Sequence, residues 1–183
     1  MKSLLVTGGT GQLGQAMLER LSGDYRCLVV TRTEFPKVDR IYGVLHLAGG
    51  FTVGSAPDDF AKMLDANLMS AVRVIEPMRE KIEDGGRIIG ISSIASQTTP
   101  AGLAAYASAK SALNAYIGVL ARDLQTRRIT ANALLPSALA TPSMLGSMPR
   151  EKLIPLERVT ETVAFLLSDA AASITGQLIA MTP

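Results

Sequence analysis

The chain has 183 residues, of which 48% are hydrophobic and 19% charged, and its formal net charge is +2. This composition is typical of a globular domain and excludes a disordered chain. The basic residues are scattered along the sequence, so no nucleic-acid partner is predicted.

The single cysteine excludes an internal disulfide and indicates a reducing compartment. The apolar stretch before the first glycines is too short for a signal peptide, and no apolar run is long enough to span a bilayer. We therefore expect a soluble cytoplasmic protein that does not contact a membrane, and the sequence indicates no metal site.

Short apolar runs alternate with helical stretches along the whole chain. The expected strands are Ser3–Val6, Cys27–Thr31, Tyr42–Leu47, Arg87–Ile91, Thr130–Leu135 and Gln177–Ala180. The expected helices are Leu13–Leu21, Asp58–Glu83, Leu103–Arg127 and Arg158–Ser168. This alternation predicts one α/β domain over residues 1–183, with a doubly wound parallel sheet covered on both faces.

A glycine-rich turn follows the first expected strand and opens the first helix. Gly9, Gly11 and Gly14 have the G-x-G-x-x-G spacing, which lets backbone N–H groups and the helix N-terminus approach a pyrophosphate. A strand before this motif and a helix after it favour a Rossmann-type dinucleotide site over a plain turn. The residues expected to contact the dinucleotide here are Gly8, Thr10, Gly11, Gln12, Leu13 and Gly14.

The end of the second strand bears on the choice of dinucleotide. Arg32 and Thr33 stand there, and the first acidic residue is Glu34. An acid at this place typically holds the ribose of NAD, whereas an arginine accommodates the 2′-phosphate of NADP. We predict that NADP(H) is preferred over NAD(H), with Arg32 and Thr33 in the site; the alternative is that Arg32 is a solvated surface residue.

Two long connections follow strands at their carboxyl ends, where open α/β sheets bind ligands. They are Ser92–Gly102 and Pro136–Pro155. The second connection is interpreted either as a mobile substrate lid or as a surface connection.

Tyr106 and Lys110 are four residues apart on the third expected helix, so both lie on one helix face. A free phenol has a pKa near 10, and a neighbouring ammonium would stabilise its phenolate. The pair is common by chance, but Ser93 stands thirteen residues upstream at the end of a strand.

With this serine, the chain resembles the short-chain dehydrogenases/reductases. The resemblance covers nearly the whole chain and extends to Asn67, His46-Leu47-Ala48-Gly49, Pro136-Ser137, Thr141-Pro142 and Ile174–Gln177. It implies an oxidoreductase that transfers hydride between the cofactor and a small-molecule carbonyl or alcohol. The further cofactor contacts that it implies are Ala48, Gly49, Gly50, Tyr106, Lys110, Pro136, Ser137 and Thr141.

The resemblance also implies four catalytic residues. Tyr106 would be the general acid or base, and Ser93 would polarise the substrate oxygen. Lys110 would lower the tyrosine pKa and hold the nicotinamide ribose. Asn67 would place a water that relays protons to Lys110.

Four features depart from the family pattern. Leu47 and Ser137 replace an asparagine and a glycine, and His46, which we interpret as a locally hydrogen-bonded strand residue, replaces another asparagine. The family's third strand is missing, because only residues 34–41 separate two expected strands. We expect an extended crossover on the face of the 58–83 and 103–127 helices, a continuous sheet of about six strands and a more open adenine side.

Two alternative functions remain. A catalytically weakened NADP(H)-binding regulator would explain the missing strand and the altered Leu47 and Ser137. The other alternative is an enzyme like those of the dihydropteridine reductase branch, which is resembled by Lys37-Val38-Asp39 leading into Leu47–Phe51 and by the stretch from Leu135-Pro136 through Thr141-Pro142 to Ser147-Met148-Pro149. That branch lacks the catalytic serine. The resemblance further implies a homodimer or homotetramer formed through the 58–83 and 103–127 helices.

Overall fold

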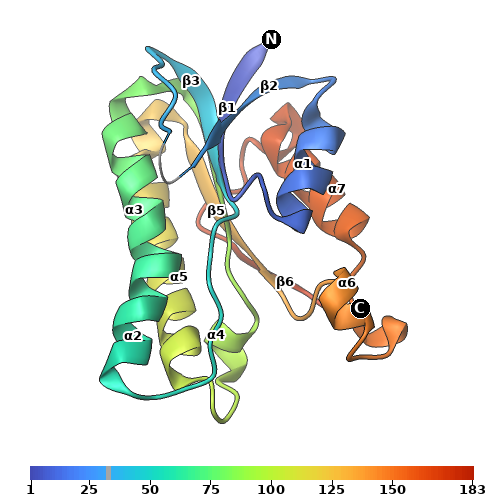
Figure 1. Cartoon of the computed structure of the whole chain (residues 1–183). Coiled ribbons are helices and arrows are strands. Elements are labelled where there is room, and N and C mark those ends of the chain that lie inside the picture. The colour runs from blue at the N-terminus through green and yellow to red at the C-terminus, as the bar shows by residue number, and fades with distance from the viewer. Residues whose placement is uncertain (32–33) are drawn as a thin grey trace.

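The computed structural model describes residues 1–31 and 34–183 and is built on a six-stranded parallel sheet (Figure 1). The strands are β1 (Lys2–Thr7), β2 (Tyr25–Val30), β3 (Ile41–His46), β4 (Ile82–Ile91), β5 (Thr130–Pro136) and β6 (Leu178–Met181). Their spatial order is β2-β1-β3-β4-β5-β6, and each pairing is parallel. The predicted Rossmann-type sheet is confirmed.

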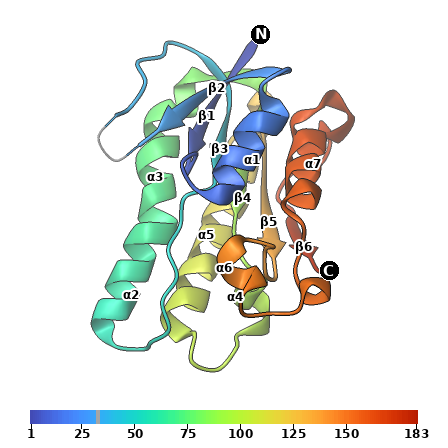
Figure 2. The same cartoon turned by 45° about the vertical axis from the view of Figure 1, so that its right-hand side comes forward.

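Helices cover both faces of this sheet, as Figures 1 and 2 show. One layer holds α1 (Gln12–Leu21) and α7 (Leu156–Leu167), and the other holds α2 (Pro57–Leu64), α3 (Ser70–Ile75) and α5 (Ala104–Asp123). The short helices α4 (Ala95–Thr98) and α6 (Pro142–Leu145) lie at the carboxyl end of the strands. The short 3₁₀ turns η3 (Gln125–Arg127), η4 (Arg150–Lys152) and η5 (Asp169–Ala171) lie in the second half of the chain. In the described residues, no helix combines the length and the apolar character that crossing a membrane requires.

The expected 58–83 helix is not one regular helix. It consists of α2, a π-helical turn η1 (Asp65–Met69), α3 and a 3₁₀ turn η2 (Glu76–Lys81). The expected end at Glu83 is wrong, because Ile82 already pairs with Ile41 in the sheet. The expected 103–127 helix likewise ends its α-helical part at Asp123 and continues as η3.

Alternate side chains of the central strands build two apolar layers. Val44 and Ile88 face α3 and α5, where they pack with Leu113 and its neighbours. The next residue on each of these strands, Leu45 and Ile89, faces the opposite layer under α1 and α7. All five side chains are buried, as expected for parallel strands covered on both faces.

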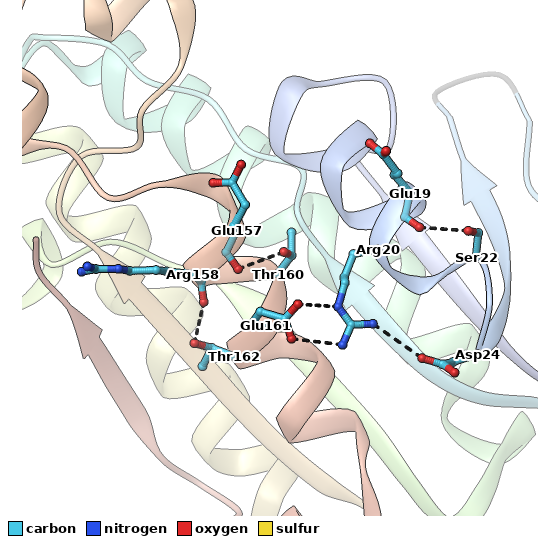
Figure 3. Close-up of polar contacts among 9 residues, drawn as sticks. All are labelled: Glu19, Arg20, Ser22, Asp24, Glu157, Arg158, Thr160, Glu161 and Thr162. Carbon is cyan, nitrogen blue, oxygen red and sulfur yellow. Dashed lines mark hydrogen bonds and ion pairs between the residues drawn. The ribbon is translucent and has the colours of Figure 1, made fainter.

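An ion pair joins the two helices of one layer at the surface. Arg20 of α1 donates to both carboxylate oxygens of Glu161 on α7, at 2.6 and 3.0 Å, and also pairs with Asp24 at 3.5 Å (Figure 3). The pair is exposed, so solvent and salt screen it and it contributes little to stability. Burial of apolar surface between α1, α7 and the sheet therefore holds this layer together.

The described part of the crossover from β2 to β3, residues 34–40, contains no helix, as expected because residues 34–41 leave no room for one. Val38 packs against the core under α3 and α5, and its carbonyl accepts a hydrogen bond from Lys81 at 2.9 Å. The expected face of the crossover is therefore confirmed. Beside it lies a cavity of about 410 Å³ whose lining includes Ser3 and Arg26, near the amino ends of β1 and β2.

Candidate active site

The glycine-rich turn joins β1 to α1 through close backbone contacts. A Cβ atom at Gly14 would lie 2.1 Å from the Gly8 carbonyl oxygen, and one at Gly8 would lie 2.7 Å from the Ala48 backbone nitrogen. Gly8 also has a φ of +70°, which favours glycine. The first turn of α1 contains no acidic residue, so its free N–H groups face no competing carboxylate. These features fit a dinucleotide pyrophosphate.

The remaining predicted residues come together because the carboxyl ends of parallel strands meet at one edge. Ala48–Gly50 follow β3, Ser93 follows β4 and Ser137 follows β5, three strands that are neighbours in the sheet. Tyr106 and Lys110 are on α5, which packs against the same part of the molecule. The sheet order thus assembles residues that are up to ninety positions apart.

Gly49 is the point where Asn67 and Lys110 meet. A Cβ atom at Gly49 would lie 2.7 Å from Asn67 Oδ1 and 3.3 Å from Lys110 Nζ. The Asn67 amide donates to the Gly50 and Met63 carbonyls, each at 3.0 Å, and its oxygen accepts from the Gly50 N–H at 3.2 Å. The buried Asn67 side chain therefore fixes the strand end after β3 to the π-helical turn η1.

Lys110 is almost completely buried, with 5% of its surface exposed. Its Nζ donates to the Ile91 carbonyl at 2.9 Å, and Ser92 Oγ bonds to the Lys110 carbonyl at 3.3 Å. Burial removes water from the ammonium and lowers the pKa of Lys110 to about 8. Lys110 can therefore change its protonation state near neutral pH.

Tyr106 lies one helical turn before Lys110, with the ammonium 5.9 Å from the ring centroid. Burial raises the pKa of the Tyr106 phenol, and an interaction with the Ser93 hydroxyl opposes this rise. Phe51 contacts the same ring edge to face, with the two ring centroids 5.0 Å apart. Ser93 itself is buried, and its Oγ accepts from the Ala95 N–H at 3.2 Å. The phenol and the serine hydroxyl are thus neighbours, as a shared substrate oxygen would require.

The connection after β5 has more structure than its sequence indicates. The Ser137 N–H donates to the Met181 carbonyl, and Thr141 precedes α6 as its N-cap. Two hydrogen bonds join the beginning of this connection to its end. The Ala140 N–H donates to the Ile154 carbonyl at 2.8 Å, and the Ile154 N–H donates to the Ala138 carbonyl at 2.7 Å. These bonds tie residues 138–140 to residue 154, so the two ends of the connection lie side by side.

Two buried residues next to the site, Thr7 and His46, have contacts that the sequence did not predict. Thr7 ends β1, and its Oγ1 accepts from the Ala48 N–H at 3.1 Å. His46 is a hydrogen-bonded strand residue, as expected, but its partners are not local: the fully buried ring contacts Thr7 and Ser70, which are 39 and 24 positions away in the sequence. Burial and the Lys110 charge lower the pKa of His46 to about 3. The position of Thr7 directly before the glycines was the available signal.

The two residues on which the cofactor preference rests, Arg32 and Thr33, lie outside the described residues.

A family model described as enoyl-(acyl carrier protein) reductase matches residues 31–182. The chain belongs to the short-chain dehydrogenase/reductase family. Its curated relatives include two 3-oxoacyl-[acyl-carrier-protein] reductases. The one from Pseudomonas aeruginosa is 32% identical, and the match covers 65% of this chain and 53% of the relative. The one from Salmonella typhimurium is 30% identical, and the match covers 80% of this chain and 66% of the relative. The chain thus spans about half to two thirds of the length of these short-chain reductases.

Solved structures agree with the fold. A blue fluorescent protein from a metagenomic library, in complex with NADPH, is 23% identical with a TM-score of 0.86, covering 98% of this chain and 96% of the other. A short-chain dehydrogenase/reductase from Serratia marcescens is 28% identical with a TM-score of 0.80, covering 98% and 95%. The family's architecture is therefore present along nearly the whole chain.

The buried Lys110 ammonium predicts a pH-dependent stability. Below pH 8 the folded state carries the charge without hydration, whereas between about pH 8 and 10.5 the unfolded state binds more protons, so folding becomes more favourable as pH rises. We expect the free energy of unfolding of the wild type, relative to Lys110→Met, to rise by about 1–3 kcal/mol from pH 7 to 10. Urea denaturation at several pH values measures it. The exposed Lys62→Met is the matched control, and a pH-independent difference for Lys110→Met contradicts the prediction.

Proposed function

We propose that this chain is an NADP(H)-dependent reductase of small-molecule carbonyl compounds, or the corresponding alcohol dehydrogenase. The observation that carries the proposal is the placement of the Tyr106 phenol beside Ser93 and one turn from Lys110, at the strand ends next to the glycine-rich turn. The glycine contacts at Gly8 and Gly14 leave a backbone cradle that fits a dinucleotide.

The residues divide the chemistry as follows. Bound NADPH would supply the hydride to the carbonyl carbon. The Tyr106 hydroxyl donates its proton to the oxygen of the substrate and is the base in the reverse direction. Ser93 donates a hydrogen bond to the same oxygen and stabilises its developing charge. The Lys110 ammonium stabilises the tyrosinate that remains, and Asn67 holds the strand end beside it and positions the water through which Lys110 exchanges protons.

The choice of substrate follows the relatives. Two of them are named as 3-oxoacyl-[acyl-carrier-protein] reductases, so β-keto thioesters and simple ketones are the first compounds to assay. A pterin-type substrate and a regulator without turnover are the competing functions. The presence of Ser93 next to Tyr106 favours the carbonyl reductase over both, because neither competitor requires a polarising hydroxyl there.

We further propose that two copies associate through α2, α3 and α5. These helices lie side by side on one face of the sheet, and α5 exposes a stripe made of Ala104, Ser108, Ala115 and Val119. Val119 is the largest apolar side chain of this stripe and is 54% exposed, and the other three side chains are small enough to let a second helix approach closely.

The general-acid role of Tyr106 is tested by Tyr106→Phe. We expect turnover with NADPH and a reducible ketone to fall about 100-fold or more, because the proton donor is lost, while NADPH still binds. Steady-state absorbance at 340 nm measures turnover. Tyr116→Phe removes a hydroxyl from the same helix and is the matched control. Full activity of Tyr106→Phe would overturn the mechanism, and binding without turnover in the wild type would favour the regulator.

The cofactor site is tested by fluorescence titration with NADPH and, separately, with NADH. We expect tighter binding of NADPH. In Gly14→Ala the new Cβ would meet the Gly8 carbonyl, so we expect NADPH affinity to fall at least about tenfold. Gly23→Ala is the control, since among the described residues no heavy atom lies within 4 Å of its Cβ position. Equal affinity of Gly14→Ala and wild type would place the dinucleotide elsewhere.

Association is tested by light scattering at micromolar concentration. We expect a dimer or tetramer for the wild type and a smaller species for Val119→Glu, which would place a charge in the contact. Phe165→Glu introduces the same charge at an exposed apolar position of α7, outside the proposed contact. A monomeric wild type, or dissociation caused only by Phe165→Glu, contradicts this interface.

A further inference from the structure

His46 is a buried histidine beneath the candidate active site that the mechanism above does not use. It ends β3, and its side chain is fully buried. Its Nδ1 lies 2.9 Å from Thr7 Oγ1 on β1, and its Nε2 lies 3.3 Å from Ser70 Oγ at the start of α3. One imidazole therefore connects two strands with a helix.

The partners determine where the single proton of this ring sits. Thr7 Oγ1 already accepts the Ala48 N–H, so its hydroxyl proton is available to Nδ1. Ser70 Oγ donates to the Ala66 carbonyl at 2.6 Å, so it accepts from Nε2–H. The ring is consequently neutral, an acceptor toward the sheet and a donor toward the helix. Among the described residues, the charged group that acts on it is the Lys110 ammonium, which disfavours a second proton.

The segments that His46 connects are those that hold the candidate site. Thr7 precedes the glycine-rich turn, and Ala48 precedes Gly49. On the other side, Ala66 belongs to the π-helical turn η1 and Ser70 follows it, so the two residues bracket Asn67. An α-helix would place these backbone groups differently, and π-helical turns are commonly found at functional sites. The ring thus contacts this turn from the side of the sheet.

We propose that His46 is a positioning residue: as a neutral donor and acceptor it holds the Asn67 turn against the ends of β1 and β3, and so sets Asn67 relative to Lys110 for proton transfer. The proposal rests on the proposed function. His46 touches no reacting atom. It acts through Asn67, whose amide it keeps in hydrogen-bonding position to the Gly50 backbone, and through the strand end that separates Asn67 from Lys110.

Replacing His46 by asparagine or by glutamine distinguishes the contact made by Nδ1 from the contact made by Nε2. In His46→Asn the short side chain reaches the Nδ1 position and keeps a partner for Thr7, but it loses the contact with Ser70. In His46→Gln the longer side chain reaches the Nε2 position and restores a donor to Ser70. The proposal requires the contact with Ser70, so we expect His46→Gln to retain the activity that His46→Asn loses.

The experiment measures kcat, the KM and Kd for NADPH, and the pH profile of kcat for both variants. For His46→Asn we expect kcat to fall about tenfold or more, a changed pH dependence of kcat and an unchanged Kd for NADPH, because a misplaced relay slows proton transfer without emptying the cofactor site. For His46→Gln we expect most of kcat and the wild-type pH profile.

Ser70→Ala approaches the same contact from the helix and keeps the sheet intact, so it serves if a His46 variant fails to fold. It should reproduce the kcat and pH effects of His46→Asn. Ser111→Ala is its matched control, because Ser111 on α5 also donates to the carbonyl four residues earlier. The proposal would be overturned if both His46→Asn and Ser70→Ala keep the wild-type kcat and pH profile. It would also be overturned if His46→Asn and His46→Gln lose kcat equally. If Tyr106→Phe retains turnover, the proposed function fails instead.

Discussion

The close approach of backbone at the ends of β1 and β3 is the constraint on which the rest of the site depends. Gly8 touches Ala48, and Gly49 leaves no room for a side chain between Asn67 and Lys110. These contacts let three separate segments share one small volume: the glycine-rich turn, the strand end after β3 and the helices behind it. Any Cβ at these glycines would push these segments apart.

The same region buries polar groups at a cost in stability. Lys110, His46 and Asn67 lie within a layer of apolar packing and have little or no exposed surface. Asn67 is satisfied by backbone partners, and His46 is neutral with two hydroxyl partners. The Lys110 ammonium donates to the Ile91 carbonyl, and its pKa is lowered by burial. The desolvation cost in this region therefore falls mainly on Lys110, the group to which the proposed function assigns the stabilisation of a tyrosinate, and such a compromise between stability and activity is common.

The missing third strand changes the edge of the sheet and leaves its centre intact. In the order β2-β1-β3-β4-β5-β6, the strands that carry the site are all internal or adjacent to the centre, and β2 forms the edge. The extended crossover packs Val38 on the core and needs no helix to do so. The missing edge strand therefore leaves the strands that carry the proposed site in place, in a chain that spans about half to two thirds of the length of its curated relatives.

The sequence by itself determined the alternation of strands and helices, the glycine spacing and the placement of Tyr106 and Lys110 on one helix face. These features depend on local periodicity, which a single segment carries. The tertiary structure alone decided that Asn67 and Lys110 meet at Gly49, that His46 turns one nitrogen to β1 and the other to α3, and that the 58–83 helix contains a π turn and ends at Lys81. Those outcomes depend on which segments pack together across the sheet, and no local pattern of residues encodes such long-range contacts.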